Sequence, residues 1–170
     1  MWWSGPMRHA PPLSGSERQM LEAFLDFHRE TLLEKCADLS PEQLATRSVA
    51  PSTLSLQGLV RHMAGVERWW FRQHMCGMQL PMLNHTKQNP DLDFDGTDPA
   101  RWPDDLETYH AEVVAARDAV ADLSLDFVAT DRHGNSVSLR WVYLHMIAEY
   151  ARHNGHADLL REALDGVTGW

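Results

Sequence analysis

Residues 138–166 read SLRWVYLHMIAEYARHNGHADLLREALDG, and this stretch decides the fold class. Its apolar residues recur at intervals of three and four, as they do on one face of an α-helix. Ser138 stands before the first apolar residue and is a favourable N-cap, and Gly166 after the last is a favourable C-terminal stop. The pattern therefore predicts one long helix between these two residues.

Three further segments have the helical period. The first begins at Ser16, the second runs from Leu56 to about Met78, and the third runs from Pro103 to about Leu123. A short helix is expected after Ser40, because a proline follows it at the first helical position. Four helices of about 20–25 residues are enough to form a four-helix bundle.

The segment between the second and third helices, residues 79–102, is rich in Pro, Asn and Asp. Its length allows it to span a helix of about 30 Å, so it can cross over and leave those two helices parallel. Its acidic part, 91–98, lacks the ligand spacing of an EF-hand, and we interpret it as a solvated loop. Residues 124–137 predict a small hairpin or an extended excursion. The predicted fold class is all-α, a four-helix bundle with a long crossover between helices two and three.

Length and charge restrict the function classes. The chain has 170 residues and a net charge of −9, which predicts one domain over 15–170 and disfavours nucleic acid as a partner. No apolar stretch reaches the length of a membrane span, and the N-terminus has no signal-peptide pattern. We expect a cytoplasmic protein with reduced Cys36 and Cys76. Residues 1–14 form a predicted N-terminal arm, and its Trp2 and Trp3 suggest a homodimer surface.

The predicted last helix carries His145, Glu149, His153 and His156. Helix positions four apart lie on one face, so a pair such as Glu149 and His153 can point at one ion. A further ligand must come from another helix, and His62 is the candidate, because it lies within the apolar stripe of the second helix. Two His, one Glu and one open position is an arrangement found in catalytic zinc sites.

The spacing alone leaves alternatives open. A His and a Glu four apart also form ordinary hydrogen-bonded pairs on solvated helix faces. For a metal, three pairs satisfy the helix geometry: Glu149 with His153, His153 with His156, and His145 with Glu149.

Two stretches carry a resemblance to a known family: the last helix, with its EYARHNGHADLLRE motif, and SLQGLVRHMAGVERWWF at 55–71. Together they resemble the DinB superfamily of metal-binding four-helix bundles, in an actinobacterial-type branch, over most of residues 16–166. The resemblance implies a metal triad of His62, Glu149 and His153, similar to that of mycothiol-dependent maleylpyruvate isomerase. His156 stands where the superfamily commonly has Gln, which leaves open a fourth ligand or a substrate contact.

The resemblance also implies an activity. It implies a metal-dependent thiol S-transferase or isomerase that uses a divalent ion, Zn²⁺ or alternatively Ni²⁺. Its co-substrate would be a low-molecular-weight thiol such as mycothiol, bacillithiol or glutathione, acting on a small electrophile. A metal-dependent hydrolase and a non-catalytic metal-binding stress-response protein are the alternatives. No separate catalytic base is evident from the sequence.

Other residues near the expected ligands have two readings. Large aromatic side chains such as Trp69, Trp70 and Trp141 most often fill the core or an interface. The alternative interpretation is that one of them lines a substrate pocket. Arg61 and Arg152 adjoin ligands in sequence and could recognise a carboxylate or phosphate on the substrate. The helix turns them about 100° away from the ligands, which favours a solvated or interhelical pairing role instead.

Overall fold

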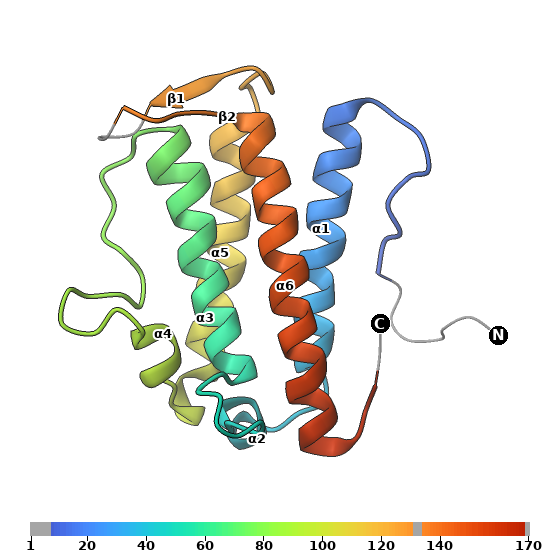
Figure 1. Ribbon diagram of the computed structural model, residues 1–170, viewed down its shortest axis with the longest axis vertical. Helices are drawn as coiled ribbons and strands as arrows, with labels where there is room; N and C mark the ends of the chain where they lie inside the picture. Colours follow the sequence, from blue (N-terminus) through green and yellow to red (C-terminus); the bar gives the residue numbers. More distant parts are fainter. Residues whose placement is uncertain (1–7, 131–133, 169–170) are drawn as a thin grey trace.

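The computed structural model describes residues 8–130 and 134–168 (Figure 1). In this part of the chain, long helices pack side by side as a bundle. Figure 1 shows that the second and third of them run in one direction, while the first and last run in the other. The parallel arrangement confirms the predicted crossover. The bundle helices are α1 (Glu17–Cys36), α3 (Leu56–Glu67) with its π-helical continuation η1 (Arg68–Met75), α5 (Trp102–Val120) and α6 (Leu139–Asp165).

The ends of α1 and α6 follow the capping residues in the sequence. The Ser16 side chain accepts a hydrogen bond from the backbone N–H of Gln19, and Ser138 accepts one from that of Trp141. These bonds satisfy amide groups that a helix leaves unpaired at its start. Gly166 ends α6 with φ of 77°, a left-handed conformation that glycine adopts without strain.

The second helix and the crossover differ from the prediction. The helix changes from α to π geometry after Glu67. Over so few residues, the spacing of apolar residues cannot distinguish a π-helix from an α-helix. The crossover is also not a plain loop. It contains α4 (Leu92–Asp95) and the 3-10 helix η2 (Pro99–Arg101), each too short to leave a periodic pattern.

The remaining elements lie at the ends of the bundle. The short helix α2 (Pro41–Ala45) follows Ser40, as predicted. The predicted hairpin is formed by β1 (Val128–Thr130), which pairs antiparallel with β2 (Ser136–Ser138). Within the described part of the chain, no helix is long and apolar enough to cross a membrane.

Residues 8–14 carry no helix and lie beside α1. Arg8 pairs with Glu34 at 2.7 Å, and the His9 amide donates to Glu30. Trp2 and Trp3 lie outside the described residues, so the homodimer surface inferred from them stays a prediction, as does the boundary between arm and domain.

A buried polar network joins the four bundle helices. Arg29 on α1 donates two hydrogen bonds to Glu67 on α3, at 2.8 and 2.7 Å, and both side chains are buried. Tyr150 on α6 donates to the same carboxylate at 2.8 Å, and Tyr109 on α5 lies 3.0 Å from the Tyr150 hydroxyl. Burial and the nearby charge of Glu67 raise the pKa of Tyr150 well above its usual value, so the hydroxyl keeps its proton.

We predict that Arg29→Ala lowers the free energy of unfolding by about 3–5 kcal/mol, because it leaves the Glu67 carboxylate buried without its cation. Arg117→Ala is the control. Arg117 pairs with Asp26 at the surface, so its loss should cost about 1 kcal/mol or less. Urea unfolding measures both. Equal losses for the two variants would show that the buried pair is not a principal tie of the bundle.

Candidate metal centre

The structure brings His62, Glu149 and His153 together between α3 and α6. Each offers one ligand atom, and these atoms lie within 4.8 Å of one another. Oε1 of Glu149 is 3.3 Å from Nε2 of His153 and 3.9 Å from Nε2 of His62. The side chains are 22%, 11% and 24% exposed, respectively. Glu149 and His153 therefore do not form a pair on a freely solvated face, as the alternative interpretation required.

The Nε2 atom of His62 provides the test of whether a metal ion fits. This atom is buried, and it has no hydrogen-bond partner among the described residues. The other ring nitrogen, Nδ1, lies 2.7 Å from Oδ2 of Asp93, to which it donates. A buried acceptor without a partner is costly. Two imidazoles and one carboxylate suit a borderline cation such as Zn²⁺, so the residues present fit the implied metal.

His153 remains neutral at this position. Burial and the neighbouring His62 lower the pKa of His153 to about 4, although Glu149 opposes the shift. A neutral imidazole keeps a lone pair at neutral pH, which a metal ligand requires.

His156 contacts His153 from the side opposite Glu149. The two Nδ1 atoms are 3.3 Å apart, so one of them donates and the other accepts. Without an ion, the Nε2–H of His153 donates to Glu149, and Nδ1 accepts from His156. With Nε2 as a metal ligand, His153 would carry its hydrogen on Nδ1, and His156 would accept it. His156 can therefore serve either tautomer of His153.

Asp93 is the site residue that the sequence did not reveal. The acidic stretch was interpreted as a solvated loop, but the Asp93 side chain is only 13% exposed and contacts His62. A carboxylate on the second nitrogen of a metal-ligating His is a recurrent arrangement that fixes tautomer and ring orientation. Asp93 reaches His62 only because the crossover folds back against α3, and the sequence pattern does not predict this.

Arg61 holds α4 in place so that Asp93 can reach His62. Its guanidinium donates to the backbone carbonyls of Leu92 and Asp93 and to the carboxylate of Asp105 on α5. Arg61 is buried and pairs between helices, and Arg152 is exposed, so the two residues take the interhelical and the solvated role expected from their helix positions.

Phe94 packs on the ring of His62. The two ring centroids are 5.4 Å apart, with an interplanar angle of 27°. A Cβ atom on Gly58 would come within 2.9 Å of the Phe94 ring, so the glycine allows Phe94 to lie this close to α3.

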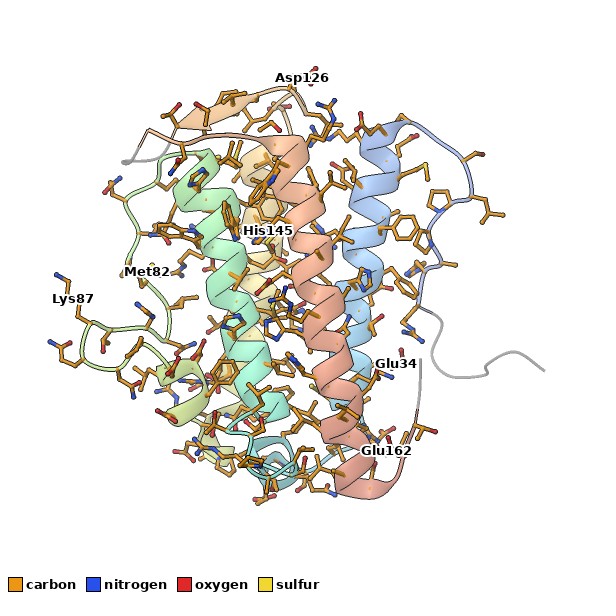
Figure 2. All side chains as sticks on the ribbon, viewed as in Figure 1. Glu34, Met82, Lys87, Asp126, His145 and Glu162 are labelled. Carbon is orange, nitrogen blue, oxygen red and sulfur yellow. The ribbon has the colours of Figure 1, made fainter. Side chains whose placement is uncertain are left out.

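His145 belongs to an aromatic cluster rather than to the ligand group. Its ring stacks on Trp141 with centroids 4.8 Å apart and contacts Trp70 edge-on at 4.7 Å. Figure 2 shows His145 between α3 and α6. Neither His145 nor His156 joins the three converging ligand atoms among the described residues. Trp70 and Trp141 thus pack around a histidine beside the site.

In this bundle a crossover leaves α3 and α5 parallel, and a His/Glu/His group lies between α3 and α6. These features define the protein as a DinB-like four-helix bundle. The family model described as mycothiol-S-transferase matches residues 20–166, and the chain belongs to that family. Searches of curated proteins and of solved structures found no match.

We predict that His62 of the metal-free protein carries its hydrogen on Nδ1, because that atom donates to Asp93. Long-range ¹H–¹⁵N NMR of the imidazole distinguishes the two tautomers. Asp93→Ala should shift His62 toward the Nε2–H form, whereas Asp95→Ala should not, because Asp95 pairs with Arg47 instead. An Nε2–H tautomer in the unsubstituted protein would contradict the proposed orientation.

Proposed function

We propose that His62, Glu149 and His153 bind one divalent metal ion, Zn²⁺ in preference to Ni²⁺, and that the protein is a mycothiol-dependent S-transferase. The unpartnered Nε2 of His62 is the observation that carries the metal proposal, because it converges with two further donors on one point. Membership of the mycothiol-S-transferase family supports the choice of thiol and reaction class.

The donor set suits thiol activation. A zinc ion bound there would favour the thiolate form of a bound thiol, which is the nucleophilic form. Glu149 is the one anion among the three proposed ligands, so it offsets one of the two positive charges and leaves a net positive site. Three protein ligands also leave a position for the thiol, whereas structural zinc sites are closed.

The surrounding residues orient the ligands. Asp93 holds His62 with Nε2 toward Glu149, and His156 accepts from Nδ1 of His153 when its Nε2 is engaged. Arg61 fixes the backbone that carries Asp93. These contacts keep the donors in place before any ligand arrives, so less ordering is needed on binding.

The two alternative functions have less support. A hydrolase would use the same donors to activate water, and a non-catalytic protein would use them as a tie between helices. The family match favours thiol transfer over both. We place the enzyme in the cytoplasm, where low-molecular-weight thiols are kept reduced.

We predict that His62→Ala, Glu149→Ala and His153→Ala each abolish stoichiometric zinc binding, because each removes a direct ligand. His145→Ala should retain zinc, since His145 packs between Trp70 and Trp141 instead. Metal analysis after dialysis against zinc gives the stoichiometry. Full zinc occupancy in Glu149→Ala, with loss in His145→Ala, would show that the ligand set is wrong.

We predict that the zinc-loaded protein accelerates consumption of a chlorinated nitrobenzene or a bimane by mycothiol, because the bound thiol is held as thiolate. Glu149→Ala should remove the acceleration, and Glu162→Ala, an exposed glutamate on the same helix, should keep it. Parallel assays use bacillithiol and glutathione. Equal rates with and without enzyme for all three thiols would exclude the transferase, and hydrolysis without any thiol would point to the hydrolase.

A further inference from the structure

A cavity of 320 Å³ lies against the face of α3 that meets the crossover. It begins at His62 on α3 and extends to Trp69 at the start of η1, about 10 Å further along at the rise of an α-helix. Figure 2 shows Met82 on the crossover segment beside α3. The remaining walls come from α3 and from two parts of the crossover, and they include Gly65, Leu83, His85, Asp91, Asp93 and Phe94.

The cavity wall is mainly apolar, and several of its polar atoms are already bonded. Asp93 accepts from His62 through Oδ2 and from the Phe94 amide through Oδ1. The Nδ1–H of His85 donates to the carbonyl of Pro90. A molecule that buries apolar surface against this wall should therefore bind more tightly than a polar one.

The charge of the cavity wall disfavours anions. Asp91 and Asp93 line the cavity, and its described lining contains no Lys or Arg. The wall itself therefore offers an anion two carboxylates and no cation, and only the proposed metal ion beyond His62 would attract it. The volume lies near the lower end of the range for small-molecule pockets, about 300–1,000 Å³, which suits a molecule of one or two rings.

His62 connects the cavity to the proposed metal centre. Its ring forms part of the cavity wall, while its Nε2 lies 3.9 Å from Glu149 on the α6 side. Phe94, another wall residue, stacks on the same ring. A molecule at the His62 end of the cavity therefore lies against the ring whose Nε2 is a proposed metal ligand, although Glu149 and His153 do not line the cavity.

We propose that this cavity binds the second substrate, a small, neutral, apolar electrophile, and that Trp69, Met82 and Phe94 determine its selectivity. The inference rests on the proposed S-transferase function. In the reaction, the thiolate sulfur gives an electron pair to the electrophilic carbon. The C–S bond forms as the bond to the leaving group breaks, and the leaving group departs with that electron pair as an anion.

Binding can be measured separately from turnover with 1,3-dinitrobenzene, which is neutral and has no halide to lose. Calorimetry with the zinc-loaded protein in the absence of thiol gives its Kd. Met82→Trp, which adds bulk at the cavity wall, should weaken binding about tenfold or more through lost burial of the probe. Met78→Trp is the matched control, because Met78 is 39% exposed, against 44% for Met82, and does not line the cavity.

Two further measurements test the cavity. One uses a substitution on α3, and the other uses an anionic probe. Gly65→Leu extends a side chain from α3, where the Cβ atom would make only ordinary contact with the Leu83 carbonyl oxygen at 3.5 Å, and an unchanged circular-dichroism spectrum checks that the fold is kept. This variant should also weaken dinitrobenzene binding about tenfold. With both probes tested on the metal-free protein, so that no zinc ion can bind the carboxylate, the anion 3,5-dinitrobenzoate should bind at least about tenfold more weakly than 1,3-dinitrobenzene, because Asp91 and Asp93 line the cavity.

The outcomes separate this inference from the proposed function. Thiol transfer that persists with unchanged KM for the electrophile and unchanged Kd in Met82→Trp and Gly65→Leu would overturn the cavity assignment and leave the transferase in place. Weakened binding in both variants, without thiol transfer by the unsubstituted protein, would support the cavity as a binding site and remove the transferase. Dinitrobenzoate binding as tightly as dinitrobenzene would overturn the preference for neutral molecules.

Discussion

The buried ion pair between Arg29 and Glu67 is the interaction on which the arrangement of the helices depends. The carboxylate also accepts from Tyr150, which in turn contacts Tyr109, so one group ties together α1, α3, α5 and α6. A buried charge in such a network is costly unless every partner is in place, which favours one register of the helices over others. Tyr150 follows Glu149 directly in the chain. The contact that sets the distance between α3 and α6 therefore also sets the distance between the proposed ligands.

The crossover is a second constraint on the same site. Arg61 binds two carbonyls of α4, and α4 presents Asp93 to one edge of the His62 ring and Phe94 to its face. Gly58 provides the space for Phe94. The same segment closes the cavity beside α3. The crossover between α3 and α5 thus has two roles. It orients His62, a proposed ligand, and it forms a wall of the proposed substrate pocket.

The sequence was sufficient for the parts of the structure that depend on local pattern. Ser16, Ser138 and Gly166 mark helix ends because capping is a local interaction, and Glu149 and His153 share a face because they are one turn apart. His62 required a tertiary argument, which came from its place in an apolar stripe and from the family resemblance. Asp93 and the cavity could not be predicted, since they depend on how a 26-residue segment between Met75 and Trp102 returns along α3. The π-helical turn after Glu67 was missed because it changes the helical period over only eight residues.

We propose that α3 and α6 hold one metal ion through two imidazoles and one carboxylate, with a position left for a thiol. X-ray absorption of the zinc-loaded protein tests it most directly. The account predicts nitrogen and oxygen neighbours at about 2.0–2.2 Å, with the scattering pattern of two imidazoles and no sulfur. On addition of mycothiol, a single sulfur neighbour should appear at about 2.3 Å. A zinc ion without imidazole neighbours, or a spectrum that mycothiol leaves unchanged, would contradict it.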